Sequence, residues 1–408
     1  MATVLRHREF RLFWVGNLIS GCGIWVQNLA LGWLIVKLTH APLVLGIFGF
    51  ASLAPTLLLA VFGGTLADRI NRRTILIVTQ SVLMLLALAL SALAYTNTLA
   101  WWHILIIAAL TGSAVAINSP AYQAIIPDLV PSQDLTAAIA LNSVQFNVAR
   151  IIGHALAGIV VVAVGEAGCF LLNALSYIAM LYALCRISVS SGHRSDDRVP
   201  FLQRTAEGMG YLRSHRALLR LILAVGCISL FGLPYFFLLP GFARDVLHID
   251  ARKLGYLTAS VSVGGLIGGL LMRAIAQHLD KHLLAATAGV SFWIALVAFA
   301  LSHTYWRSVA LLIVLGFALV LTISTINNLL QISTPPALRG RVMSIYGIAL
   351  NGLAPLGSVL AGALAQRTSL QTAIAILSLT GAGATALALF RPTSLRHKEN
   401  TECPALSA

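Results

Sequence analysis

Charge is the property that this sequence has least of. Charged side chains make up 10% of its 408 residues, whereas a soluble globular protein carries about 25%. Hydrophobic residues make up 58%, and the mean hydropathy is +0.88. Because so few polar side chains cannot cover a water-facing surface, we expect a protein that resides in a lipid bilayer.

Two further absences restrict the function. The five cysteines have neither a CxxC spacing nor a histidine at ligand spacing, so no metal site and no disulfide framework is expected. The chain has no Gly-Lys dipeptide and therefore no G-x-x-x-x-G-K-[ST] phosphate loop, which disfavours an ATP-driven mechanism. We expect no cofactor, and any transport must draw its energy from an ion gradient.

Apolar stretches of membrane length, by contrast, recur from one end of the chain to the other. A helix of about 20 apolar residues crosses a hydrocarbon core of about 30 Å and satisfies its own backbone hydrogen bonds there. The first stretch has full membrane length, so we expect a resident helix and not a cleaved signal peptide. The twelve predicted spans are Phe13–Val36, Leu43–Ala67, Thr74–Tyr95, Trp101–Asn118, Ala137–Val164, Gly168–Ile187, Ala217–Leu238, Leu254–Ala274, Leu283–Leu301, Ser308–Asn328, Arg341–Ala365 and Leu370–Phe390.

Basic residues predict the orientation. With the N-terminus in the cytoplasm, 20 of the 27 Lys and Arg residues fall in cytoplasmic segments, six fall outside and Arg150 lies within a helix. Cytoplasmic loops are enriched in these residues, so both termini are predicted to lie on the cytoplasmic side of a bacterial-type inner (plasma) membrane. Anchorage to an anionic leaflet explains the net charge of +14. Nucleic acid is not an expected partner.

The sequence repeats itself at an offset of 204 residues. This shift aligns NVARIIGHALAG (147–158) with NGLAPLGSVLAG (351–362), and Gly112 with Gly316. Because six spans separate the copies, the two halves share one orientation, an arrangement in which the substrate site lies near the membrane midplane between the halves. We predict an all-α fold of two parallel six-helix repeats: a bundle over 1–187, a cytoplasmic linker over 188–216, a second bundle over 217–390 and a cytoplasmic tail over 391–408.

Glycines predict close helix packing. The eighth span carries two interleaved GxxxG patterns, which allow the backbones of neighbouring helices to approach where lipid gives no hydrophobic drive. The fifth span offers glycines as a possible partner. The predicted packing residues are Gly264, Gly265, Gly268 and Gly269 in the eighth span and Gly153 and Gly158 in the fifth.

The segment GGTLADRINRRT (63–74) lies at the cytoplasmic end of the second span. A carboxylate beside three guanidinium groups at a helix end can form charge-assisted bonds in one conformation and lose them in another. A positive-inside anchor is the alternative, but it explains only the arginines. We predict a gate that comprises Gly64, Asp68, Arg69, Arg72 and Arg73.

This segment resembles the loop between helices two and three of the major facilitator superfamily, G-x-x-x-D-R-x-G-R-R, with Asn71 in place of the usual glycine. The segments NLALGWLIVKLTHAPLVLG (28–46), IPDLVPSQDL (126–135) and FLLNALSYIA (170–179) resemble the efflux branch that includes enterobactin exporters and macrolide efflux proteins. The resemblance covers nearly the whole chain. It implies the major facilitator fold and the export of a small organic compound, without naming the cargo.

A polar stripe runs along the fifth span. At 100° per residue, Ser143, Asn147, Arg150 and His154 lie within about 60° of arc. An arginine at the bilayer centre costs at least about 2.5–3.5 kcal/mol unless it faces protein or water. Two interpretations of Arg150 stay open: it attracts anionic or catecholate-like oxygens of a cargo, or asparagine side chains and backbone carbonyls hold it statically.

Some positions depart from the family pattern. Related exporters usually have proline where His154 stands; a buried imidazole is a candidate carrier of the coupled proton, and a histidine that only packs is the alternative. Asp68 is the other candidate, because all thirteen acidic residues lie outside the mid-membrane region. Relatives often carry Asp and Arg where Asn118 and Tyr122 stand, so a familiar ion pair is replaced by neutral side chains.

Other residues are candidate contacts for the cargo. Gln27 and Asn28 in the first span can hydrogen-bond either a cargo or a neighbouring helix. Tyr235, next to the helix irregularity expected at Pro234, belongs to an aromatic run that suits a flat organic molecule. The alternative is that such aromatic residues simply face lipid or neighbouring helices.

Taken together, these features predict a proton-coupled exporter of a siderophore- or drug-like compound that works by alternating access, as a monomer in the lipid bilayer. An importer or facilitator with the same fold is the first alternative. A membrane-embedded enzyme or a receptor is the second, and the predicted spans lack the nucleophile, base or metal cluster that an enzyme needs.

Overall fold

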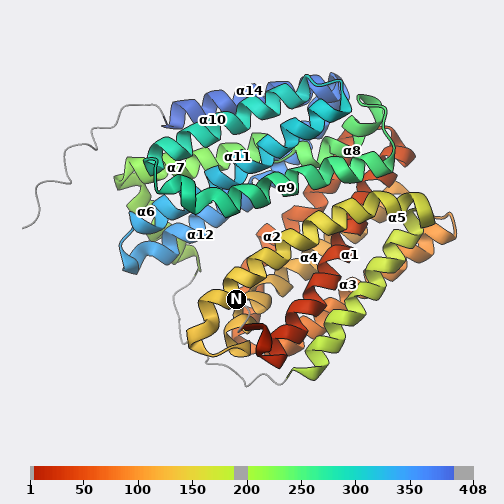
Figure 1. Cartoon of the computed structure of the whole chain (residues 1–408), viewed down its shortest axis with the longest axis horizontal. Coiled ribbons are helices and arrows are strands. Elements are labelled where there is room, and N and C mark those ends of the chain that lie inside the picture. The colour runs from red at the N-terminus through yellow and green to blue at the C-terminus, as the bar shows by residue number, and fades with distance from the viewer. Residues whose placement is uncertain (1–3, 188–200, 390–408) are drawn as a thin grey trace, which may run out of the picture.

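The computed structural model describes residues 4–187 and 201–389, and for 60–69, 201–206 and 389 the backbone alone. Within these ranges the chain is helical and contains no strand (Figure 1). The first half comprises η1 (Val4–Arg6), α1 (Arg8–Thr39), α2 (Pro42–Arg69), α3 (Arg72–Tyr95), α4 (Trp101–Ile125), η2 (Ile126–Leu129), η3 (Ser132–Asp134) and α5 (Leu135–Arg186). The second comprises α6 (Phe201–Ser214), α7 (Arg216–Cys227), η4 (Ile228–Gly232), α8 (Tyr235–Asp245), α9 (Ala251–Ala276), α10 (Lys281–Ala300), α11 (Tyr305–Ile332), α12 (Pro336–Gly352), α13 (Ala354–Arg367) and α14 (Leu370–Leu389).

The described chain crosses the membrane twelve times. Eleven helical stretches are long and apolar enough to span a bilayer, and one of them, Ser132–Arg186, has 55 residues, more than twice the required length. Gly165, with φ 71° and ψ 179°, breaks this stretch into two crossings. The twelve predicted spans and the all-α fold are therefore confirmed.

The seventh crossing is longer than the sequence predicted. Its expected end was Leu238, but α7, η4 and α8 continue the crossing to Asp245. The irregularity expected at Pro234 takes the form of the π-helical turn η4, in which the Leu233 N–H donates to the Ile228 carbonyl at 2.9 Å. A π turn accommodates a proline that has no N–H of its own without ending the helix.

The predicted linker, 188–216, contains a helix that hydropathy did not indicate. Helix α6 packs on α12, and an ion pair joins Glu207 to Arg341 at 2.6 Å. This contact attaches the described part of the linker to the second half.

Glycines at equivalent positions of the repeat make equivalent contacts. Gly112 packs against α2 and its counterpart Gly316 packs against α9, which are the second and eighth crossings. Likewise Gly153 packs against α1, and Gly357 packs against η4 in the seventh crossing. The offset found in the sequence is thus reproduced in the helix packing of the two halves.

The halves share one core at one end only. We name the end where α1 leads into α2 the closed end, and the end that carries the N-terminus the open end. Towards the closed end, buried residues of both halves, such as Leu29 and Leu254, form a single cluster. Towards the open end, the cluster around Phe10 belongs to the first half alone and the cluster around Leu221 to the second. The halves therefore separate towards the open end.

Two glycine contacts close the boundary between the halves. A methyl group at Gly158 of α5 would lie 2.6 Å from the Ala251 carbonyl oxygen of α9. A methyl group at Gly362 of α13 would lie 2.9 Å from the Pro42 carbonyl oxygen of α2. Figure 1 shows α5 and α9 side by side across this boundary. Backbones approach this closely only where the side chain is a hydrogen atom.

Candidate functional site

A cavity of about 710 Å³, lined by both polar and apolar side chains, lies in the first half towards the open end. We name it the antechamber. Helices α1, α3, α4 and α5 line it, and its polar side chains include Asn17, Gln80, Asn118, Tyr122, Asn142, Ser143, Gln145 and Asn147.

Neutral hydrogen bonds join the four helices α1, α3, α4 and α5 around the antechamber. Asn17 of α1 donates to the Tyr122 hydroxyl at 2.7 Å and to Gln145 Oε1 at 2.6 Å, and the Tyr122 hydroxyl donates to Asn142. Asn118 donates to the Thr79 hydroxyl of α3 at 2.7 Å. Asn118 and Tyr122, the two positions at which relatives often carry an ion pair, thus hold neutral bonds between helices.

Sequence reasoning missed Asn17, Asn142 and Gln145. A signal for the first was available, since Asn17, Gly21 and Asn28 are spaced i, i+4 and i+11 and so share one face of α1. The other two lie outside the arc of the stripe that was predicted on the fifth span.

A second cavity, of about 310 Å³, lies between the two halves. We name it the aromatic chamber. Trp25, Asn28, Phe48 and His154 line it from the first half, and Phe236, Phe237, Pro240 and Thr258 line it from the second. Trp25 also lines the antechamber, so its indole lies where the two cavities meet.

His154 is 1% exposed and lies among aromatic rings. Its ring centroid is 4.9 Å from that of Trp25 and 5.9 Å from that of Phe236. Its Nδ1 makes no hydrogen bond of ordinary geometry, although the Arg150 carbonyl lies close by on the preceding turn. This histidine thus faces both halves at the boundary where they meet.

Arg150 lies on α5 between Asn147 of the antechamber lining and His154 of the chamber lining; it lines neither cavity itself and contacts the second half. Its Nη2 donates to Asn147 Oδ1 at 3.2 Å, and its guanidinium carbon is 5.9 Å from the Phe146 ring centroid. A methyl group at Gly265 of α9 would come within 3.3 Å of Nη2. Its buried Nε has no partner, and no carboxylate of the described chain pairs with it. The asparagine contact is the one expected of a static arginine, and the unpaired donor is the feature expected of a cargo site.

The other predicted cargo contacts separate into two groups. Asn28 lines the chamber, and Ser143 and Asn147 line the antechamber. Gln27 instead accepts a hydrogen bond from Asn173 at 2.8 Å within the first half, and Tyr235 packs on Phe299 with ring centroids 6.4 Å apart. Neither of these two belongs to the lining of either cavity.

The GxxxG glycines of the eighth span pack mainly on α11, and among them Gly265 alone meets the predicted fifth span, through Arg150. Gly264 and Gly268 pack against the backbone of α11, Gly265 faces Arg150, and nothing lies within 4 Å of a methyl group at Gly269. Of the two glycines in the fifth span, Gly153 packs on α1, and Gly158 meets α9 near Gly255 instead of at the GxxxG positions. The motif indicates that a close neighbour exists, but not which helix it is.

The predicted gate is described in part. Gly64, Asp68 and Arg69 are described by their backbone alone. Arg72 contacts Asp128 and the Ala124 carbonyl, both at 2.8 Å. Arg73 donates to the carbonyls of Leu184 and Cys185 at 2.6 and 3.0 Å. Both arginines thus bind helix ends of their own half.

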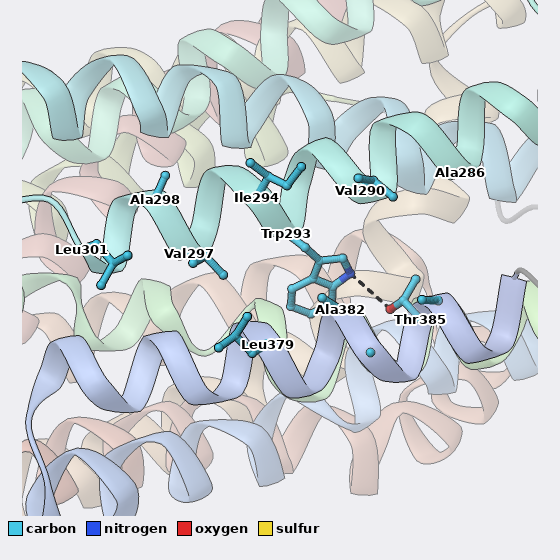
Figure 2. Close-up of a pocket in the computed structure, with 12 residues that line it drawn as sticks. Ala286, Val290, Trp293, Ile294, Val297, Ala298, Leu301, Leu379, Ala382 and Thr385 are labelled. Atoms are coloured by element: carbon cyan, nitrogen blue, oxygen red, sulfur yellow. Dashed lines mark hydrogen bonds between the residues drawn. The ribbon is translucent and has the colours of Figure 1, made fainter.

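An apolar groove of about 620 Å³ lies between α10 and α14 (Figure 2). Trp293 reaches across it and donates to the Thr385 hydroxyl at 3.2 Å. Ile294 and Leu379 at its rim are 63% and 60% exposed. A groove so open and apolar on the outer side of a membrane helix pair suits lipid acyl chains, and we do not place it in the transport pathway.

Comparisons with known proteins bear on the whole chain. Residues 2–405 match the family model described as transmembrane secretion effector. The chain is 26% identical to the staphyloferrin A transporter of Staphylococcus aureus, over 86% of this chain and 88% of that protein. It is 25% identical to macrolide efflux protein A of Streptococcus pyogenes, over 88% and 90% of the two chains.

Two solved structures share the fold. The nucleoside transporter NupG superposes with a TM-score of 0.74 at 13% identity, over 94% of this chain and all of that one. A bacterial homologue of the iron transporter ferroportin, in an inward-facing state, gives 0.70 at 18% identity, over 94% and 99%. The chain belongs to the transmembrane secretion effector family of the major facilitator superfamily, and it is a membrane transporter with exporters among its relatives.

Proposed function

We propose that this protein exports a small organic compound across the inner membrane in exchange for protons, by alternating access. The observation that carries the proposal is the arrangement of the two cavities. The aromatic chamber is built from both halves just inside the shared core of the closed end, and the antechamber leads towards the open end. Relatives named for a siderophore and for macrolide efflux support export of a siderophore- or drug-like cargo.

The distribution of basic residues supports an orientation with both termini in the cytoplasm. The open end then faces the cytoplasm, and the structure represents the inward-facing state in which an exporter takes up its cargo. One chain supplies both bundles, 1–187 and 217–390, joined by the linker 188–216 and followed by the tail 391–408, so a monomer suffices.

Arg150, Asn147, Ser143 and Asn28 are the proposed contacts for the cargo. Gln27 and Tyr235, the other two candidates from the sequence, lie outside the linings of both cavities. His154 is the preferred carrier of the coupled proton because it lies at the boundary that must open. Asp68 is the second candidate, and with Gly64, Arg69, Arg72 and Arg73 it forms the proposed gate at the cytoplasmic face.

The test is uptake of candidate compounds into inside-out vesicles with an imposed pH gradient. We expect accumulation in wild-type vesicles when the lumen is acidic, and loss of accumulation when the gradient is collapsed. Asp68→Asn should slow uptake, while Asp245→Asn, a matched change on α8 at the closed end, should not. Uptake that is indifferent to the gradient would remove proton coupling, and accumulation only in right-side-out vesicles would identify an importer.

A further inference from the structure

We infer that the aromatic chamber is a subsite for a flat, uncharged aromatic ring at one end of the cargo, while the polar end of the cargo lies in the antechamber. The inference rests on the proposed transport function and specifies the class of substrate. It assigns a role to aromatic residues that the polar stripe alone does not indicate.

Four of the thirteen residues that line the chamber are Trp or Phe. Trp25 and Phe48 come from the first half, and Phe236 and Phe237 from the second. Phe48 and Phe237 stand edge to face across the boundary with their centroids 6.1 Å apart, and Phe236 and Phe237 do the same at 6.2 Å. Aromatic rings prefer offset or edge-to-face neighbours, so walls arranged in this way suit an additional flat ring.

The polar groups of the chamber suit hydrogen bonds to a neutral ring. Ser52 and Thr258 also line it, but their hydroxyls already donate to backbone carbonyls of their own helices at 2.8 and 3.0 Å. The Asn28 amide and the His154 imidazole remain for a ring substituent such as a hydroxyl. The described lining contains no Asp, Glu, Lys or Arg, and an ionised ring would therefore be buried without a counter-ion.

The size of the chamber decides how much of a cargo it holds. Its volume of about 310 Å³ is at the low end of the roughly 300–1,000 Å³ usual for small-molecule sites. It takes one or two fused rings, and a larger cargo must extend past Trp25 into the antechamber. Arg150 follows Ala149 of the antechamber lining and lies one turn before His154 of the chamber lining, and its buried Nε has no partner, so an acidic group next to the ring is favoured. The expected class is an amphipathic aryl compound, such as an arene carboxylate.

The construction from two halves connects ring binding to transport. When the closed end opens, the residues of α8 and α9 move away from those of α1, α2 and α5, and the ring loses about half of its contacts. A site that is complete only while the closed end is sealed holds the ring in the inward-facing state and releases it on the other side.

The test compares two ligands that differ in planarity. Naphthalene-2-carboxylate and its saturated analogue decahydronaphthalene-2-carboxylate are titrated calorimetrically into the purified full chain in detergent, with titrations into detergent alone subtracted. The saturated acid is the more hydrophobic of the two, so general apolar partitioning favours it. We expect the aromatic acid to bind about 3- to 10-fold more tightly, the range set by aromatic contacts.

Two matched variants test whether the chamber is the origin of the preference for the aromatic acid. Phe236→Leu should bring the ratio of the two affinities close to one, and Phe50→Leu, the same change at a residue 39% exposed on α2 and outside the chamber, should leave it unchanged. If Phe236→Leu does not fold, Phe48→Leu replaces it. An affinity ratio near one in the wild type overturns the inference, and so does an equal loss in Phe50→Leu.

The outcome separates the subsite from the transport function. If the protein prefers the aromatic acid but shows no gradient-dependent uptake in vesicles, the subsite is supported and the proposed export function is wrong. If the protein exports compounds in a gradient-dependent way but does not prefer the aromatic acid, the export function is supported and the aromatic subsite is wrong.

Discussion

Arg150 is a cation between apolar helices, and no carboxylate of the described chain balances its charge. Such a residue costs about 2.5–3.5 kcal/mol or more in the membrane centre. Replacing Arg150 with methionine keeps an unbranched, flexible side chain and removes the charge. We expect the thermal midpoint in detergent to stay the same or rise, while transport of an acidic cargo in vesicles falls at least tenfold.

The control for this change is Arg307→Met at the exposed start of α11, which should alter neither quantity. A static structural arginine would behave in the opposite way: Arg150→Met would lower the midpoint by leaving Asn147 without its partner, and the protein that still folds would transport normally. The two measurements together therefore distinguish the two interpretations that the sequence left open.

The sequence predicted part of this site because helical periodicity assigns residues to faces. Ser143, Asn147 and His154 do line cavities, as their common arc indicated. Periodicity cannot tell which face of which distant helix lies opposite. Asn17 meets Gln145 across 128 positions of the chain, and His154 meets Phe236 in the other half; only the packing of whole helices creates these pairs.

At the scale of an element, Gly165 separates the fifth and sixth crossings. Its φ of 71° and ψ of 179° lie in a region that is essentially restricted to glycine, and nothing lies within 4 Å of a methyl group placed on it. Gly165→Ala therefore strains the backbone without creating a clash. We expect a loss of about 1–3 kcal/mol, seen as a lower thermal midpoint of the purified protein.

Gly269→Ala is the matched comparison, because its methyl group also meets nothing within 4 Å while its backbone is helical. It should gain about 0.5–1 kcal/mol from the better helix propensity of alanine. Equal midpoints for the two variants would mean that the break at Gly165 carries no conformational strain.

Hydropathy located every crossing but not every boundary. It ended the seventh crossing at Leu238, seven residues early; beyond this point Pro240 packs on Gly32 and Arg244 donates to the Val36 carbonyl, and hydropathy does not contain these contacts with α1. It also treated α6 as linker, because the Glu207–Arg341 ion pair that attaches α6 to α12 joins residues far apart in the chain. Both errors come from contacts that a local pattern does not contain.

At the scale of the whole molecule, the closed end is sealed by two symmetric glycine contacts, Gly158 on α9 and Gly362 on α2. Polar contacts add to them: Arg244 of α8 donates to the Val36 carbonyl of α1 and lies 3.5 Å from the His40 ring nitrogen. Each contact joins one half to the other. If the halves rock as rigid bodies, fixing one of these contacts must stop transport, while fixing a contact inside one half must not.

We therefore expect a short thiol cross-linker across His40→Cys and Arg244→Cys, in a chain whose native cysteines are replaced by serine, to abolish transport in vesicles and to be reversed by reduction. Lys37→Cys with Glu166→Cys is the control at the same end. That pair replaces a 2.5 Å ion pair within the first half. Cross-linking it should leave most of the transport rate, because rigid-body rocking changes no distance inside a half.

Each deviation from this result has a distinct meaning. Loss of transport in both cross-linked proteins would show that the first half must deform internally, so the rocking of rigid halves would be wrong. Persistence of transport in the His40–Arg244 cross-link would show that the closed end need not open, and the cargo would then leave through the side of the bundle. The pathway opens by separating Gly158 from α9 and Gly362 from α2 only if two results hold together. The cross-link between the halves must stop transport, and the cross-link within the first half must leave it active.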